Sequence, residues 1–225
     1  MLSRLRLLLV LSLYFCTFNL WAAEDLLARI QALTPLIGSY PPNLPDDNAK
    51  RAVTQRYEAL KAELDRELSA HPDALEVRYQ RGYLQALGHN FDYPQAWKGA
   101  SDDLRAVLRK NPQHLPALLQ LGQLWVNSDL TLAGKAEQLF RAAQCIQGET
   151  PLEDAQRGLF FAFYYQGKMR DAYLQGQYLT KTWPENRQYL ALYNMVRSVL
   201  KRTQQTLPTD AKIAISCEPG DPAIP

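Results

Sequence analysis

The sequence has few of the side chains that carry most enzyme chemistry. Its 225 residues include only three histidines and three cysteines. The histidines, His71, His89 and His114, do not have the spacing of metal ligands on one helix, and no cysteine lies near them in the chain. A glycine-rich phosphate loop, a nucleophilic serine elbow and a pair of catalytic carboxylates are also absent. We therefore expect no metal, no cofactor and no enzymatic activity.

The sequence also lacks an excess of charge of one sign. It contains 25 lysines and arginines and 23 aspartates and glutamates. Residues 1–23 hold two of the basic residues and none of the acidic ones, so the remainder has 23 of each. A surface for nucleic acid or for an anionic membrane needs a clustered basic excess. We therefore expect no nucleic-acid partner, and no membrane contact beyond the N-terminus.

The N-terminus has the layout of a secretory signal. Arg4 and Arg6 precede an uncharged apolar run, residues 7–18, which is followed by small residues. We expect residues 1–23 to direct export, to the periplasm of a bacterium. The uncharged residues 7–23 are 17 in number, at the lower edge of what spans a bilayer. An uncleaved inner-membrane anchor is therefore the alternative.

Proline and glycine recur at one spacing in the middle of the chain. Pro72 lies ten residues before Gly82, and Pro112 lies ten residues before Gly122. Each pair spans a stretch with the periodicity of an amphipathic helix. Small, aromatic and turn residues then continue the pattern; they are Ala136, Phe140, Ala143, Gly167, Ala172 and Pro184.

With this pattern, residues 57–201 resemble an array of tetratricopeptide repeats. The resemblance implies an all-α fold, a right-handed superhelical array of antiparallel helix pairs. We expect four parts, which are a signal peptide or anchor (1–23), a short helix with a proline-rich linker (24–46), the array (47–202) and an extended tail (203–225).

The first helices show both the pattern and a departure from it. Residues 47–70 place an apolar stripe opposite a charged face, which predicts the opening helix. The next helix follows Pro72, and its partner starts near Ala100. The repeat consensus allots 24 residues from its small residue to its closing proline, whereas Gly82 to Pro112 is 30. The extra residues predict an enlarged turn that contains Asn90, Phe91, Tyr93, Pro94 and Trp97.

The next two hairpins differ in how they achieve close packing. Gly122 predicts close approach of two helices, with Trp125 and Phe140 filling the space around the contact. In the third hairpin Phe160 replaces the small residue of the consensus. Either that helix is rotated, or Gly158 supplies the close approach. Residues 187–201 then predict a final helix that caps the stack.

Two pairs of acidic residues have the appearance of helix starts. Asp46 and Asp47 lie at the start of the opening helix. Asp102 and Asp103 lie near the expected start of the helix that begins around Ala100. Carboxylates at a helix N-terminus complement its dipole and cap its free amides. We therefore expect both pairs to lie at helix N-termini.

Two cysteines remain after removal of residues 1–23. They are Cys145 and Cys217, and in an oxidising compartment we expect a disulfide between them. It would fasten the tail to the second repeat and would contribute on the order of 4 kcal/mol. The alternative is two unpaired thiols. Within the tail, residues 212–216 alternate like a short strand that could lie along the array.

In the tetratricopeptide family the first helices of successive repeats line a concave surface that holds other proteins. The resemblance assigns to this surface Tyr79, Tyr83, Leu119, Gln123, Val126, Asn127, Arg157, Phe161, Tyr164 and Tyr165. Phe160 and Phe163 are expected in the core. The implied function is a non-enzymatic periplasmic adaptor or scaffold that holds a peptide or a partner protein. The alternative is a membrane-anchored structural component of an envelope assembly or of a cytochrome c maturation-type complex.

Overall fold

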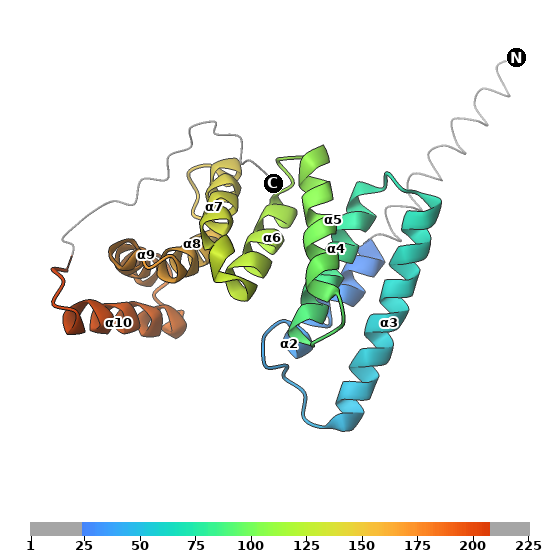
Figure 1. Cartoon of the computed structure of the whole chain (residues 1–225), viewed down its shortest axis with the longest axis horizontal. Coiled ribbons are helices and arrows are strands. Elements are labelled where there is room, and N and C mark those ends of the chain that lie inside the picture. The colour runs from blue at the N-terminus through green and yellow to red at the C-terminus, as the bar shows by residue number, and fades with distance from the viewer. Residues whose placement is uncertain (1–23, 208–225) are drawn as a thin grey trace, which may run out of the picture. The chain divides into compact units, whose positions relative to one another are not determined.

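The computed structural model describes residues 24–207, and all the regular structure in that range is helical (Figure 1). Residues 24–31 form a helix that is followed by Thr34–Ile37 (α2), Asp47–Ala70 (α3), Leu75–Asn90 (α4), Ala96–Lys110 (α5), Leu115–Ser128 (α6), the short 3-10 helix Leu130–Leu132 (η1), Ala133–Gln147 (α7), Glu153–Tyr165 (α8), Met169–Thr182 (α9) and Arg187–Arg202 (α10). The all-α prediction is confirmed for these residues. None of their helices combines the length and the apolar character needed to cross a bilayer.

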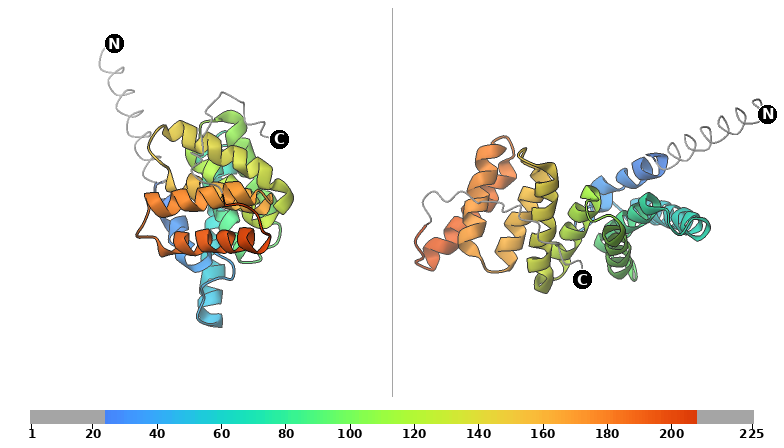
Figure 2. Two further views of the ribbon diagram at one scale, coloured as in Figure 1. Left: turned by 90° about the vertical axis from the view of Figure 1, so that its left-hand side faces the viewer. Right: turned by 90° about the horizontal axis from the view of Figure 1, so that it is seen from above.

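The chain divides into two compact units at Leu104 and Arg105, within α5. In the C-terminal unit each helix from α6 to α10 packs against the next, and α6 also contacts α8. Figure 2 shows these helices from two further directions. Neighbouring helices therefore pack as expected for helical hairpins. The two units are described separately below.

The N-terminal unit is built around α3 and includes the segment expected to be a linker. Asp46 caps α3 by accepting a hydrogen bond from the amide of Ala49 (2.8 Å). The stripe of α3 is buried as predicted, through Val53, Tyr57, Leu60, Leu64 and Leu68. Its core also contains side chains from the preceding segment, namely Leu26, Ile30, Leu33 and Ile37. The expected short helix is therefore present, but residues 24–37, with Pro35 among them, are a packed layer of this unit.

The enlarged turn between α4 and α5 is much shorter than predicted. Helix α4 continues to Asn90, and α5 begins at Ala96, so the turn is residues 91–95. Asn90 and Trp97 are helical, and the extra length of this hairpin lies mainly in its helices. Asp92 and Gln95 have positive φ angles of 55° and 62°, by which the chain reverses.

Gly82 brings α4 and α5 together, as its place in the pattern predicts. A Cβ atom there would lie 2.9 Å from Cγ of Leu104, closer than real side chains approach. The expectation for Asp102 and Asp103 is wrong, because α5 starts six residues earlier, at Ala96. Asp102 is exposed and pairs with Lys98 (2.6 Å), whereas the buried carboxylate of Asp103 is bound by Arg81 at 2.7 and 2.8 Å.

In the C-terminal unit Phe140 of α7 lies between glycines of two other helices. A Cβ atom at Gly122 of α6 would lie 2.8 Å from the ring of Phe140, and one at Gly158 of α8 would lie closer still. The predicted close approach at Gly122 is therefore present. Gly158 supplies a close approach as well, but to α7 of the preceding hairpin and not to α9, its partner in the third hairpin.

Between α8 and α9 the large and small residues have exchanged helices. Phe160 of α8 is fully buried, and its ring faces Gly176 of α9, where a Cβ atom would lie 3.3 Å from it. In the preceding pair the glycine, Gly122, is on the first helix and the ring of Phe140 is on the second. The replacement at Phe160 is thus matched by a glycine on the opposite helix.

A chain of buried glutamines links α7, α8 and α9. Gln144 Nε2 donates to the carbonyl oxygens of Gly148 and Thr150, and its Oε1 accepts from the amide of Leu152. Gln156 donates to the same Oε1 at 2.8 Å, and Gln175 donates to Oε1 of Gln156 at 2.7 Å. These amides satisfy the backbone of the connection between α7 and α8, which positions the start of α8.

Candidate functional site

The residues assigned to a protein-binding surface fall in both units. Tyr79 and Tyr83 belong to α4 in the N-terminal unit. The others belong to α6 and α8 in the C-terminal unit. The two sets are therefore considered one at a time.

The side chains of Tyr79 and Tyr83 make contacts within the N-terminal unit. Tyr79 is only 8% exposed, and its ring stacks on that of Tyr83 at 6.3 Å. Burial, followed by the nearby Tyr83, raises the pKa of the Tyr79 hydroxyl above its ordinary value. The hydroxyl of Tyr83 forms a 2.7 Å hydrogen bond with Thr34 Oγ1 of α2. Tyr83 thus helps to hold residues 24–37 in place.

On α6 the predicted residues form a stripe that is partly open to solvent. Leu119 and Gln123 are half-buried, and Asn127 is exposed. They are four residues apart, so they lie on one side of the helix. Val126, which the resemblance also assigned to the surface, is fully buried and belongs to the core. The α6 stripe is defined here as Leu119, Gln123 and Asn127.

On α8 the two classes of aromatic residue separate as predicted. Phe160 and Phe163 are buried in the core. Phe161 is half-buried, and Tyr165 is 37% exposed, with their rings stacked at 6.3 Å. Tyr164 is half-buried and meets the ring of Tyr165 edge to face at 5.5 Å. The rings of Phe161 and Tyr165 thus form a short ladder with one side open.

The α6 stripe and the α8 ladder belong to helices that contact each other. Arg157, one turn before Phe161, is half-buried and donates to Asp154 of the same helix at 2.8 Å. Its charge is therefore partly satisfied within α8. The accessible groups of these two helices are apolar or aromatic side chains and two amides, which suit an apolar or amphipathic segment better than a free carboxylate.

Met195 of α10 was missed by the sequence analysis. It is 38% exposed. It lies 34 residues after Phe161, which is the length of one tetratricopeptide repeat. The preceding steps of the pattern in this chain are longer, since Gly82 and Gly122 are 40 residues apart, and residues 187–201 were expected only to cap the stack.

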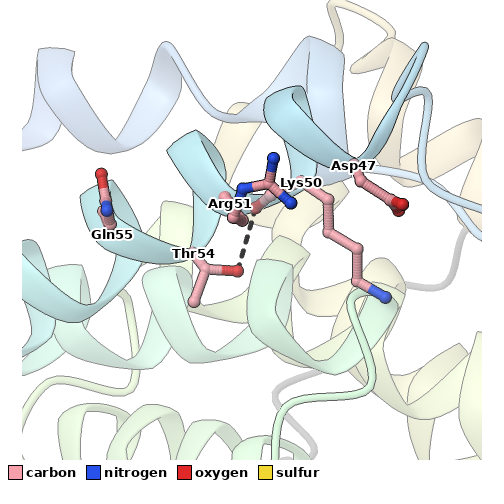
Figure 3. A pocket seen from close by; sticks show the side chains of 5 residues that line it. All are labelled: Asp47, Lys50, Arg51, Thr54 and Gln55. Atoms are coloured by element: carbon pink, nitrogen blue, oxygen red, sulfur yellow. Dashed lines mark hydrogen bonds between the residues drawn. The ribbon is translucent and has the colours of Figure 1, made fainter.

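A polar pocket of about 430 Å³ lies in the N-terminal unit along the first turns of α3 (Figure 3). It is lined by Asp47, Lys50, Arg51, Thr54 and Gln55. Thr54 Oγ1 donates to the carbonyl oxygen of Lys50 at 3.0 Å, so that hydroxyl is engaged by its own helix. The two basic side chains are offset in part by Asp47. Asp47 is the only carboxylate among these lining residues, and none of them is a histidine or a cysteine.

The histidines and Cys145 are used in the structure of the chain. His114 caps α6, since its Nδ1 accepts a hydrogen bond from the amide of Ala117 (3.2 Å). His71 follows the last residue of α3 as its C-cap, and His89 lies within α4. No group of three potential metal ligands occurs within residues 24–207. Cys145 is disulfide-bonded, while Cys217 lies outside the described residues, so the pairing of these two stays a prediction.

The chain matches no protein-family model, no curated protein and no solved structure. Its likeness to tetratricopeptide arrays therefore depends on the residues and contacts described above.

Proposed function

We propose that this protein is a non-enzymatic adaptor of the tetratricopeptide type, which holds a segment of a partner protein on the face formed by α6 and α8. In this proposal the helix pairs form a right-handed superhelical array, and the first helices of the C-terminal unit present the α6 stripe and the α8 ladder. The partner segment is apolar or amphipathic, bound as a helix or an extended strand.

The observation that carries the proposal is that Tyr165 is 37% exposed and that Phe161, whose ring stacks on it, is only half-buried. Phe160 and Phe163, on the same helix, are buried in the core. Packing of the core therefore does not account for the two more accessible rings. Aromatic side chains offer a large apolar surface and lose little rotamer entropy on binding, which is why they are common at interface hot spots. Gln123 and Asn127 beside them supply amide donors and acceptors for the backbone of a bound segment.

Two contacts support the tetratricopeptide assignment. Gly82 and Gly122, the small residues of the repeat pattern, each occupy a place where a side chain would collide with a neighbouring helix. Small residues at such positions are what the repeat uses to bring its helices together. Export is proposed from the N-terminal pattern of charge and hydropathy, and the disulfide at Cys145 is consistent with an oxidising compartment.

The proposal is tested by photo-crosslinking in the cell envelope. A photoreactive phenylalanine analogue replaces Phe161 in one strain and Ile146 in a control strain. Ile146 is 41% exposed, but it lies on α7, the second helix of its pair. We expect a discrete crosslinked protein from position 161 and none from position 146. Equal capture from both positions, or no capture from position 161, would contradict the proposal.

A further inference from the structure

The last helix, α10, carries charge of only one sign. Arg187, Arg197, Lys201 and Arg202 are its only charged residues, and all four are exposed. None of them forms an ion pair with another residue in the range 24–207. Residues 24–225 contain equal numbers of basic and acidic residues. Within this neutral total, α10 carries a local basic cluster at the end of the C-terminal unit.

The same helix exposes apolar side chains. Its inner side is buried through Tyr189, Val196 and Leu200. Away from that side, Leu190 is 54% exposed and Met195 is 38% exposed. Leu190 and Met195 therefore lie outside the face that packs against α9. An outer face that is both basic and apolar is suited to a segment that is both acidic and apolar.

The chain turns back as it leaves α10. Gln204 has a positive φ of 53°, and the amide of Gln205 donates to the carbonyl oxygen of Leu200 at 2.9 Å. This is the geometry of a Schellman motif, which ends a helix and redirects the chain. Leu207, the last described residue, is already half-buried.

We infer that the C-terminal tail, residues 208–225, returns along the outer face of α10 and covers it. The tail contains Asp210, Glu218 and Asp221 but only one basic residue, Lys212. Between the first two acids, Ile213 and Ile215 alternate with smaller residues, so in an extended chain both point to one side.

The lengths of the two partners agree. Lys201 and Arg187 are 14 residues apart on α10, which is about 21 Å along a helix. Asp210 and Glu218 are eight residues apart, which is about 26 Å in an extended chain. Asp210 therefore meets the end of α10 at Lys201 and Arg202, Glu218 meets Arg187, and the two isoleucines lie over Met195 and Leu190.

The disulfide at Cys145 is compatible with this path. Tyr189, near the start of α10, donates to Glu153 of α8 at 2.6 Å. Gln144, next to Cys145, accepts from the amide of Leu152 just before α8. The end of α7 and the starts of α8 and α10 thus meet at one end of the unit. A tail that runs back along α10 carries Cys217 toward that end, where it bonds to Cys145.

The tail is located by methyl NMR on the full chain purified after export, with the disulfide intact. The probe is the methyl group of Met195, assigned by its loss in Met195→Leu. We expect NOEs from this methyl to the δ1 methyl of Ile213 or Ile215. Absence of these NOEs, with tail amide signals as sharp as those of a free peptide, overturns the inference. Peptide mapping that joins Cys145 to Cys16 also overturns it.

Charge-reversal variants test the electrostatic part. Lys201→Glu combined with Arg202→Glu is expected to reduce these NOEs at least threefold, and Asp210→Lys in that background is expected to restore them. Lys181→Glu, an exposed change on α9, should leave them unchanged. Sedimentation of the full chain with phosphatidylglycerol vesicles, lost in Arg187→Glu, would instead assign the basic face to an anionic bilayer and overturn the inference.

Discussion

The ring of Phe140 packs against the bare backbone of Gly158, and no side chain fits between them. Because Phe140 also faces Gly122, one ring joins α7 to two other helices. The separation of three helices in the C-terminal unit thus depends on the absence of two side chains.

We expect Gly158→Ala to lower the free energy of unfolding by about 1–3 kcal/mol, because the added methyl group overpacks the contact with Phe140. Unfolding in urea measures the change. Gly134→Ala is the matched control, since its Cβ atom would lie 3.5 Å from Gln166, an ordinary contact. That change should stabilise the chain by up to about 1 kcal/mol through helix propensity. Equal stability of Gly158→Ala and the parent would show that α7 and α8 do not pack as described.

Asp103 is the centre of a buried polar network in the N-terminal unit. Its carboxylate, whose side chain is 5% exposed, accepts hydrogen bonds from Arg81 and from Gln85 Nε2 (3.0 Å). Asp103→Asn should lower the free energy of unfolding by about 3–5 kcal/mol, because Arg81 loses a buried partner. Asp102→Asn, at the exposed neighbour, should change it by less than about 0.5 kcal/mol. Similar effects of the two substitutions in calorimetry would refute this role of Asp103.

Glu137 makes the stability of the C-terminal unit depend on pH. Burial acts to raise the pKa of this carboxyl, but hydrogen bonds from Lys168, Gln166 and Arg141 hold it below its ordinary value of 4.5. A lowered pKa in the folded state stabilises the fold above pH 4.5, and this contribution is lost as the pH falls through the folded-state pKa. Glu137→Gln should therefore be less stable than the parent at neutral pH.

The difference in stability between the parent and Glu137→Gln should shrink as the solution is acidified below about pH 4.5. Denaturant unfolding of both proteins across a pH series measures it. A difference that stays constant with pH would mean that the carboxylate charge contributes nothing.

Two tyrosines assigned to the same surface should respond differently to truncation. Tyr79→Ala removes a buried ring and should lower the free energy of unfolding by on the order of 3 kcal/mol. Tyr165→Ala should change it by less than about 1 kcal/mol, since the ring is 37% exposed. Thermal melting separates the two variants. In the crosslinking experiment from position 161, Tyr165→Ala should reduce partner recovery while the chain stays folded.

Most helices could be predicted because capping residues and prolines mark their ends in the sequence. The expected opening helix, residues 47–70, coincides with α3, and its start follows from the capping side chain of Asp46. Pro112 and Pro184 likewise lie just outside α6 and α9. Such signals act over a few residues, and tertiary packing did not override them here.

The errors concern contacts between residues far apart in the chain. Asp103 was misplaced because its partner, Arg81, lies 22 residues earlier, and local charge patterns do not show such a pair. Residues 24–46 were expected to form a short helix and a proline-rich linker, without a place in the core. The apolar residues at 26, 30, 33 and 37 have the spacing of a buried helical face, which was the overlooked signal.

For the candidate site, the sequence could indicate which residues are aromatic but not which remain open. Tyr83 and Phe161 have the same place in the repeat pattern. Tyr83 is engaged by Thr34, a contact across 49 residues, whereas Phe161 is not covered in this way. Exposure thus depends on what the rest of the chain places over each ring.

The contact between Phe160 and Gly176 has a consequence for what each position tolerates. Because the ring of Phe160 occupies the space that a side chain at position 176 would need, the two positions are coupled. A larger residue at position 176 therefore requires a smaller one at position 160, and the two substitutions should not be additive in their effect on stability.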